Sequence, residues 1–273
     1  MTEVNLDKAV ILARGLGTRM RKNDDDAHLT DAEQAVADTG VKALIPIDRP
    51  FLDYVISGLA DAGYRRICLI IGPEHDVIRD YYGSLDCERV TIEFAVQVEP
   101  LGTADAVAAA EDFAGDDPVL VINSDNYYPV EALAGLRQCT GSALAAFDRG
   151  ALIAESNIPA DRITKFAVVE LGEDDTMRRI IEKPSPEAIA ALPEPVGVSM
   201  NCWRFTPSIF EACRNITPSS RGEYEVTDAV QYVIDHLDES FEVLHVAGAV
   251  LDMSSRTDIA AVREALTGTE VNL

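Results

Sequence analysis

This sequence of 273 residues predicts an α/β fold with a Rossmann-like, mixed and mainly parallel sheet flanked by helices. Short apolar runs alternate with segments of helical periodicity before Gly141, as in strand–helix–strand crossovers. After Gly141 the apolar runs follow one another closely, which predicts a smaller β extension of the sheet. Apolar residues make up 47% of the chain, so at this length one large domain can bury a core.

The first half of the chain is predicted element by element from its hydropathy pattern. Residues 8–13 (KAVILA) form a short β-branched run before glycines, which indicates a buried strand. Residues 52–62 place apolar side chains at i, i+3, i+4 and i+7, as an amphipathic helix does. The same patterns predict strands at 66–72, 90–97 and 118–123, and helices at 103–113 and, closed by a glycine, at 74–83.

The second half is predicted to begin with a meander that extends the sheet. The predicted strands of this half are 143–147, 164–171, 177–183, 198–205, 241–246 and 249–253. The predicted helices are 207–213, 226–236 and 257–266, with a short helix in the proline-rich loop at 184–195. Nearer the N-terminus, residues 23–41 are polar and acidic, which predicts an inserted loop with a short helix.

Composition narrows the range of partners. Acidic residues outnumber basic ones 47 to 23, for a net charge of −24, and such a surface repels nucleic acid and anionic membranes. The five cysteines are scattered without CxxC pairing, which indicates reduced thiols in a cytoplasmic protein. The first residues, MTEVNLDKAVIL, lack a basic and apolar signal segment, and no window reaches the roughly 20 apolar residues of a membrane span.

A glycine turn follows the first predicted strand, in the stretch ILARGLGTRMR. Gly15 and Gly17 would let the backbone approach a phosphate, and Arg19 and Arg21 would add positive charge. This arrangement favours an anionic ligand, although an ordinary turn with solvated arginines would have the same sequence. A dinucleotide motif, GxGxxG, is disfavoured because Met20 replaces its third glycine and no helix is predicted to open at once.

Polar residues also stand at the end of the strand predicted at 90–97, where open parallel sheets bind ligands. Gln97 ends this strand, and its amide can pair with the edge of a base. Gly102 and Thr103 start the next predicted helix, whose N-terminus can meet ribose or phosphate oxygens. The alternative is a plain helix N-cap after a polar strand end.

Two acids and two lysines complete the pattern. Asp125 lies just past a buried strand and Asp252 ends an apolar one, and such carboxylates suit Mg²⁺, which also binds substrate phosphates. Lys183 ends a predicted strand before a proline, and Lys42 does much the same near the start of the chain. Taken singly, each acid is also explained as a capping residue and each lysine as a solvated one.

Taken in order, these segments resemble the sugar-phosphate nucleotidylyltransferase family, the nucleoside-diphosphate-sugar pyrophosphorylases. The similar segments are LARGLGTRM, VKALIPI, QVEPLGTADAV, NSDNYY, FAVVELGEDDTMRRIIEKP, GEYEVTDAV and VLDMSSRTDI. The resemblance implies a single nucleotidyltransferase domain over 1–273, with a nucleotide-binding half at 1–141 and, including the β extension, a sugar-phosphate-binding half at 142–273. It also implies a reaction in which an NTP and a sugar 1-phosphate give an NDP-sugar and pyrophosphate, with Mg²⁺ as cofactor.

The resemblance implies a role for each matching residue. The catalytic cations would be Arg19 at the leaving pyrophosphate, Lys42 in the same anionic site and Lys183 at the sugar phosphate. The metal ligands would be Asp125 and Asp252. The nucleotide-binding residues would be Ala13, Gly15, Gly17, Thr18, Gln97, Gly102 and Thr103. The sugar-phosphate-binding residues would be Ala167, Glu182, Lys183 and Asn201.

Several residues depart from the family pattern. Arg14 stands where a small residue is usual, and either adds charge to the triphosphate site or points to solvent. On the sugar side Ala167 replaces a common glycine, Leu251 replaces a common tryptophan, and Ser254–Ser255 replaces a Gly-Thr pair. We therefore expect an acceptor other than plain glucose 1-phosphate, such as a cyclitol phosphate. The insertion at 23–41 is either a mobile cover over the nucleotide or a surface elaboration.

The base, the activity and the assembly stay open at this point. The segment around Gln97 looks most like uridylyl- and thymidylyl-transferring members, which favours UTP or dTTP, while guanylyl-transferring members carry a similar PLGTA run. A non-catalytic, nucleotide-binding regulatory relative would keep the pocket without turnover. A metal-dependent glycosyltransferase would use a related sheet, but NSDN matches its DxD signature poorly. The family often forms dimers or tetramers, and no segment here indicates the interface of a homo-oligomer.

Overall fold

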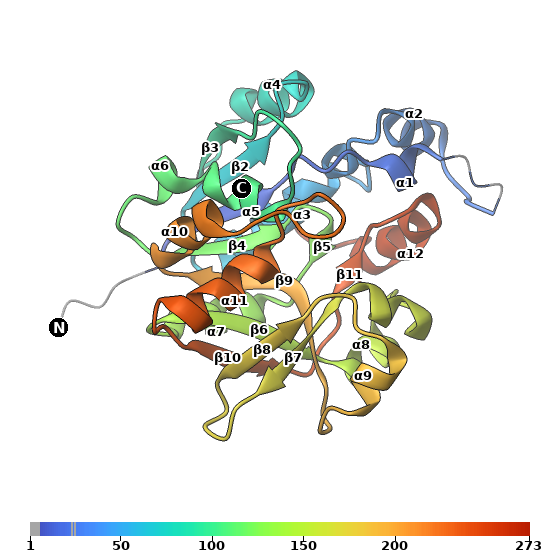
Figure 1. Cartoon of the computed structure of the whole chain (residues 1–273). Helices are drawn as coiled ribbons and strands as arrows, with labels where there is room; N and C mark the ends of the chain where they lie inside the picture. The colour runs from blue at the N-terminus through green and yellow to red at the C-terminus, as the bar shows by residue number, and fades with distance from the viewer. Residues whose placement is uncertain (1–5, 23, 25) are drawn as a thin grey trace.

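The computed structural model describes residues 6–22, 24 and 26–273, and its centre is a mixed sheet of nine strands (Figure 1). Four parallel strands lie in the order β4-β1-β2-β3. They are β1 (Lys8–Leu12), β2 (Arg66–Ile71), β3 (Thr91–Val96) and β4 (Val119–Asn123). All four agree with the predicted strands to within one residue at each end. The N-terminal stretch in which no signal segment is predicted begins at residue 1, and residues 1–5 of it lie outside the described residues.

The helices up to residue 114 differ from the predicted α-helices at three places. They are α1 (Thr18–Arg21), α2 (Asp31–Thr39), η1 (Lys42–Leu44), α3 (Phe51–Asp61), α4 (Asp76–Ser84), α5 (Thr103–Ala108) and α6 (Glu111–Ala114). α1 begins directly after Gly17, so the expectation that no helix opens there was wrong. Gly83 lies inside α4 rather than closing it. The predicted helix 103–113 divides because Ala110 adopts a φ of −90° and a ψ of 0° between α5 and α6.

The second half adds five strands to the same sheet. They are β6 (Ser142–Asp148), β7 (Ala167–Leu171), β8 (Met177–Ile181), β9 (Gly197–Phe205) and β10 (Phe241–Val246). β9 lies between β4 and β6 and is antiparallel to both, so it joins the two halves. The predicted meander was wrong in part, because α8 (Arg149–Glu155) and η2 (Ala160–Lys165) separate β6 from β7. The strand predicted from residue 164 therefore begins at Ala167.

The remaining elements are helices and one small ribbon. They are β5 (Asn126–Tyr127), α7 (Val130–Gln138), α9 (Pro186–Ala190), α10 (Ser208–Asn215), α11 (Val226–His236), β11 (Leu251–Asp252) and α12 (Arg256–Leu266). Neither α7 nor α8 was predicted, and the strand predicted at 249–253 is only the two-residue β11, paired with β5. Within the described chain, no helix combines the length and apolar character that a membrane crossing needs. All five cysteines are free, and three are buried.

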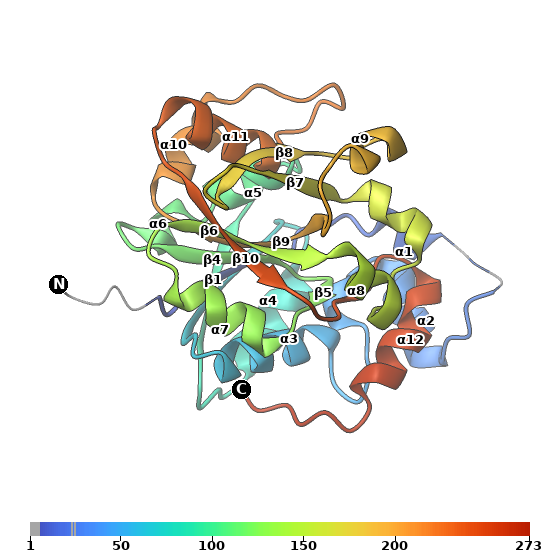
Figure 2. The same ribbon diagram turned by 90° about the horizontal axis from the view of Figure 1, so that it is seen from below.

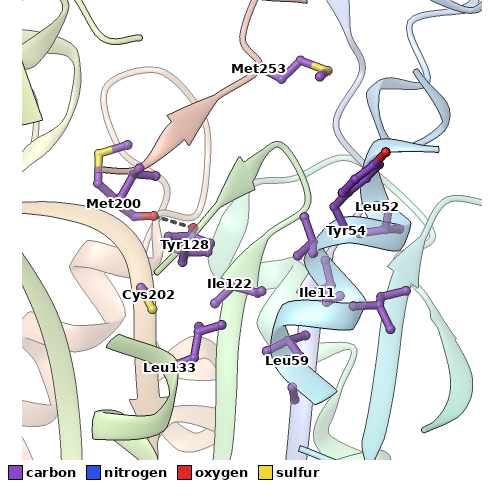
Figure 3. Close-up of a cluster of buried hydrophobic side chains, with 14 of the residues drawn as sticks. Ile11, Leu52, Tyr54, Leu59, Ile122, Tyr128, Leu133, Met200, Cys202 and Met253 are labelled. Atoms are coloured by element: carbon purple, nitrogen blue, oxygen red, sulfur yellow. Dashed lines mark hydrogen bonds between the residues drawn. The ribbon is translucent and has the colours of Figure 1, made fainter. Parts of the chain in front are cut away.

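Two apolar layers cover the sheet, one on each face. Figure 2 shows the helices that carry them, with α5, α10 and α11 on one side of the strands and α3 and α7 on the other. Alternate residues of β1 point to opposite faces. Ile11 belongs to the layer formed with α3, α7 and α12, part of which Figure 3 shows, and Val10 belongs to the layer formed with α5, α10 and α11. Because both faces are covered, the carboxyl ends of the parallel strands are the natural place for a ligand.

β9 changes partners along its length, and the sheet splits there. The strand pairs with β7 around Ser199 and with β4 around Trp203. Between these points Asn201 has a φ of 54°, a left-handed conformation that asparagine tolerates better than most residues. The Tyr128 hydroxyl donates to the Met200 carbonyl at 2.7 Å and holds β9 at the split (Figure 3).

The acidic insertion contains α2, which lies beside α12 in Figure 1 and confirms the short helix predicted there. Glu33 of α2 is buried and accepts from Arg263 of α12 at 2.5 Å. Asp38 accepts from Arg256 of α12 at 2.6 Å. These two ion pairs attach the described part of the insertion to the body of the protein.

Candidate active site

A cavity of about 440 Å³ opens at the carboxyl ends of β1, β2, β3 and β4. It brings together ten residues that were predicted from the sequence to bind nucleotide, pyrophosphate or metal. They are Ala13, Gly15, Gly17, Thr18, Arg19, Lys42, Gln97, Gly102, Thr103 and Asp125. These residues follow β1, β3 and β4, and they meet because the three strands run parallel in one sheet, with β2 between β1 and β3.

The glycine turn forms one wall of this cavity. Gly17 has a φ of 59°, and a Cβ there would lie 2.0 Å from the Gly40 carbonyl oxygen, so only glycine fits. At Gly15 a Cβ would meet nothing within 4 Å, which leaves the backbone open to a ligand. Arg19 lines the cavity. Arg21 was expected to add charge beside it, but its Nε donates to the last carbonyl of α2 at 2.9 Å.

Lys42 and Asp125 form an ion pair in the cavity wall. The Lys42 Nζ lies 2.8 Å from Asp125 Oδ2, and 13% and 23% of the two side chains are exposed. The insertion does not carry Lys42 away from the glycine turn, because Gly40 packs directly on Gly17 after α2. A phosphate that enters here meets a cation and a carboxylate held at hydrogen-bond distance.

Asp252 lies close to Asp125 but is buried and lines neither this cavity nor the smaller one described below. The Met253 N–H donates to the Asp125 carbonyl at 2.8 Å and holds the two segments together. The Asp252 carboxylate accepts from Arg162 at 2.9 Å and from Asn126 at 3.1 Å. Burial, and then the negative charge of Asp125, raises the pKa of Asp252. Over the described residues, no three His, Cys, Asp or Glu side chains gather as a metal cluster.

Hydrogen bonds fix the orientation of the Gln97 amide. Its Nε2 donates to the Gly102 carbonyl at 3.0 Å and to Asp105 Oδ2 at 2.8 Å, so both amide hydrogens are used. Gly102 has a φ of 128°, and a Cβ there would lie 2.4 Å from the Tyr224 carbonyl oxygen. The Thr103 hydroxyl accepts from the first N–H of α11 at 2.8 Å, so it also braces this loop.

A second cavity, of about 60 Å³, lies where the sheet splits beside Asn201. Ala167, Glu182 and Asn201, three of the residues expected to bind the sugar phosphate, line it. Asn123 lines both cavities and joins them. Lys183 lines neither of the two: its side chain is exposed, and its φ of 47° is unusual for a residue before proline.

Glu182 titrates near neutrality. Burial, and then the negative charge of Glu225, raises the pKa of Glu182 to about 7, while Arg221 opposes the shift. Arg221 lies 3.6 Å from the Glu182 carboxylate but 2.5 Å from that of Glu225, so it pairs mainly with Glu225. The wall of the smaller cavity therefore changes charge between mildly acidic and mildly basic solution.

Five polar residues that line the larger cavity had no role, or no definite role, predicted from the sequence. They are Arg14, His75, Asn123, Ser124 and Glu223. The strand-end rule that pointed to Gln97 also applies to Asn123, the last residue of β4, and to His75, which follows β2. Burial lowers the pKa of His75. Glu223 comes from the loop between α10 and α11, in the segment GEYEVTDAV that resembles the family, but no role was predicted for it.

A family model for nucleotidyl transferases matches residues 8–248. The chain belongs to the nucleotidyl transferase family. Among curated relatives, low-salt glycan biosynthesis nucleotidyltransferase Agl11 of Haloferax volcanii is 31% identical over 84% of this chain and 57% of its own length. Glucose-1-phosphate thymidylyltransferase of Streptomyces griseus has the same identity and coverage. UTP–glucose-1-phosphate uridylyltransferase AglF of Haloferax volcanii is 27% identical over 92% of this chain and 93% of its own length.

This nucleotidyl transferase spans a little over half the length of the first two of these relatives. Its fold is similar to that of a solved UDP-glucose pyrophosphorylase in complex with UDP-glucose, with a TM-score of 0.75 over 97% of this chain and 100% of the other. The sequence identity between the two is 19%, so the likeness concerns the fold alone. It confirms the predicted sheet, mixed and mainly parallel, flanked by helices in a single domain.

Proposed function

We propose that this nucleotidyl transferase moves a nucleotidyl group from an NTP to a sugar 1-phosphate, or to a sugar-like cyclitol phosphate, with release of pyrophosphate. The observation that carries the proposal is a pair of cavities that meet at Asn123. The larger has a glycine turn and cations for phosphates, and the smaller has amide and carboxyl groups for hydroxyls. The names of two relatives mention glucose 1-phosphate and support the same chemistry.

The reaction brings two anions together, and the basic side chains offset their repulsion. A phosphoryl oxygen of the acceptor attacks the α-phosphorus in line, and pyrophosphate leaves on the opposite side. In this proposal Arg19 holds the leaving pyrophosphate, Lys42 lies at the same anionic site, and Lys183 reaches the acceptor phosphate. The attacking oxygen is already ionised, so positioning and charge stabilisation supply the catalysis and no general base is required.

The nucleotide is proposed to bind along the ends of the parallel strands. The turn from Ala13 to Thr18, with Gly15 and Gly17, would donate backbone N–H groups to the triphosphate. Gln97, together with the Gly102–Thr103 loop, would contact the base. UTP or dTTP is favoured, since two relatives are named as uridylyl- and thymidylyltransferases, and GTP is a further option.

Mg²⁺ is the proposed cofactor, with Asp125 and Asp252 as the side chains that would hold it. These two carboxylates suit Mg²⁺, because this ion is usually held by one or two carboxylates together with substrate phosphates. The pKa of Asp252 is raised partly by the charge of Asp125, and a divalent cation would relieve this repulsion. When bound, the ion would stabilise negative charge on the phosphoryl oxygens. Lys42 and Arg162 balance part of the same carboxylate charge.

The acceptor is proposed to lie along Ala167, Glu182 and Asn201, with Glu182 as a hydrogen-bond acceptor for hydroxyls. The departures from the family pattern on this side of the site favour an acceptor other than plain glucose 1-phosphate. We also propose a cytoplasmic location, which the five free cysteines support.

A matrix of substrates tests the proposed reaction. Each of five nucleoside triphosphates is combined with a panel of sugar and cyclitol phosphates in the presence of Mg²⁺, and products are identified by mass. We expect pyrophosphate release that requires both substrates and the metal. A regulatory relative would bind nucleotide without release, and a glycosyltransferase would consume NDP-sugar instead. Either result would refute the proposal, and equal turnover of all acceptors would refute the selective sugar site.

The Asp125→Asn variant tests the proposed metal site. We expect turnover to fall on the order of 10²–10³-fold, as when a group that stabilises transition-state charge is removed. The melting temperature should change little, because the amide keeps the shape of the side chain and an acceptor for Lys42. Asp61→Asn is the matched control, since Asp61 pairs with Arg89 at 2.7 Å outside the cavity lining. A large loss of stability with normal specific activity would mark Asp125 as structural.

A further inference from the structure

Arg14 follows β1 and lines the larger cavity with a side chain that is only 7% exposed. Its Nη1 has no hydrogen-bond partner in the described part of the chain. The other guanidinium nitrogens face the Glu74 carboxylate, but each of these contacts is 3.4 Å long, near the outer limit for a hydrogen bond. An unused N–H on a buried charged group is unfavourable, so the arrangement indicates an acceptor from outside the chain.

The Arg14 side chain lies toward β2 rather than β4. A Cβ placed on Gly72 would lie 2.6 Å from Arg14 Nε, so the guanidinium group extends over the end of β2. Gln97 is next along this edge, because its N–H donates to the Ile71 carbonyl at 2.9 Å. Asp125 follows β4, on the other side of β1. Arg14 therefore faces the Gln97 end of the cavity and not the Asp125 end.

Gln97 and Arg14 offer complementary groups to a ligand at that end. Both amide hydrogens of Gln97 are used within the chain, so its Oε1 can only accept. The guanidinium group of Arg14 can only donate. Together they match a ring N–H beside an oxo group, which uracil, thymine and guanine present. Cytosine and adenine reverse this order, with a ring acceptor beside an amino group, so in the same position they would leave both side chains unpaired.

We propose that Arg14 determines which base the enzyme accepts. Its Nη1 donates to the oxo group of the base, O4 of uracil or thymine or O6 of guanine, next to the ring N–H that Gln97 accepts. The inference rests on the proposed function, because it takes the larger cavity as the nucleotide site. Glu74 holds the guanidinium group only through long contacts and leaves Nη1 without a partner. Because Nη1 is itself buried, the guanidinium group turns toward the cavity when it meets the base.

The test uses two pairs of nucleotides that differ at this edge, UTP with CTP and ITP with ATP. Their binding to the full chain with Mg²⁺ is measured by calorimetry without any acceptor, for the native sequence and for Arg14→Ala. We expect the native protein to prefer the oxo member of a pair, and Arg14→Ala to reduce that preference roughly tenfold or more. Pyrophosphate affinity should stay the same. Arg66→Ala, which removes an exposed guanidinium paired with Glu93, should leave the preference unchanged.

Three results would overturn the inference. Two are no preference in the native protein and an unchanged preference in Arg14→Ala. The third is an equal loss of affinity for all four nucleotides with weaker pyrophosphate binding, since that pattern marks a phosphate contact. If Arg14→Ala does not fold, the same preference is measured for Arg14→Lys. Lysine keeps the positive charge but lacks the planar guanidinium group, so the preference for the oxo base should fall in this variant too. Binding is measured without turnover, so failure of the proposed reaction would appear separately, as no pyrophosphate release with any acceptor.

Discussion

Glu182 illustrates how one residue makes the proposed acceptor site depend on pH. Its pKa of about 7 means that the side chain is largely neutral at pH 6 and largely ionised at pH 8. A carboxylate accepts hydrogen bonds from hydroxyls better than a carboxylic acid does. We expect the KM for the acceptor to fall as pH rises from about 6 to about 8, measured by initial rates of pyrophosphate release.

The matched variant is Glu182→Gln, whose side chain does not titrate. The acceptor phosphate itself titrates near pH 6, so part of the pH dependence should survive in this variant. The part of the pH dependence of KM that disappears in Glu182→Gln is the contribution of Glu182. If the two KM profiles are parallel, Glu182 does not bind the acceptor.

The raised pKa of Glu182 also makes the stability of the folded protein depend on pH. The folded state holds this proton more tightly than the unfolded chain, in which the pKa is near the ordinary 4.5. The stabilisation is therefore complete below pH 4.5 and is lost as pH rises through about 7. We compare the melting temperature of Glu182→Gln with that of the native protein by calorimetry. The difference in favour of the variant should be larger at pH 8 than at pH 5.

At the residue scale, the sequence could predict which residues gather, but not what each side chain does there. Gln97 and Asp125 meet because strand ends of a parallel sheet meet, which is a property of the fold class. Arg21 and Thr103 instead bond to backbone groups of α2 and α11. Those partners are remote in the sequence, so no local pattern reveals them. The unpartnered Nη1 of Arg14 is likewise visible only once its neighbours are known.

At the element scale, α12 supports the glycine turn through α2 and α1. Arg256 donates to the Met20 carbonyl of α1 at 2.6 Å and to Asp38 of α2. Arg263 donates only to Glu33 of α2 among the described residues. The two arginines thus share a helix and a partner helix, but only Arg256 contacts the segment that lines the larger cavity.

This difference predicts that the two arginines can be separated experimentally. Arg263→Ala leaves the buried Glu33 without its cation and should cost about 1–3 kcal/mol of unfolding free energy, with the KM for NTP unchanged. Arg256→Ala should also destabilise, and in addition raise the KM for NTP, because the turn after β1 loses its anchor. Urea unfolding and steady-state kinetics measure the two effects. An equal rise of KM in both variants would show that α2 itself, and not the α1 contact, supports the site.

The elements that the sequence missed are those whose stability depends most on tertiary contacts. α7 has nine residues and α8 has seven, both below the roughly 12 at which isolated helices form. Gly135 lies inside α7 because Leu244 packs against it, where a Cβ would lie 2.6 Å from the Leu244 side chain. In contrast, the four parallel strands have short apolar runs and α3 has a periodic apolar pattern, and both signals are readable without tertiary partners.

At the scale of the whole molecule, the join between the halves could not be predicted. β9 inserts between β4 and β6, and the residues that it pairs with there are 49 to 86 positions away in sequence. The smaller cavity arises from the same strand, where the pairing passes from β4 to β7. Local patterns predict strands and their ends, whereas the order of antiparallel strands follows from packing across the whole sheet.

Net charge is the other property of the whole molecule. The 47 acidic residues face 23 basic ones, so 24 carboxylates have no cationic counterpart even if every base is paired. Like charges on a folded surface repel one another and favour the expanded, unfolded chain. Salt screens this repulsion, with a Debye length of about 10 Å at 0.1 M and about 3 Å at 1 M.

We therefore expect the melting temperature to rise with KCl from roughly 0.1 M to 1 M, most steeply at the low end, because screening of the net repulsion outweighs the weakening of surface ion pairs. The matched variant replaces three exposed acids outside the cavities, Asp112→Asn, Asp116→Asn and Glu264→Gln. It should melt at a higher temperature than the native protein at low salt and gain less from added KCl, by differential scanning calorimetry. If both proteins gain equally, the salt effect comes from general exclusion of salt from the surface, and the acidic excess does not limit stability.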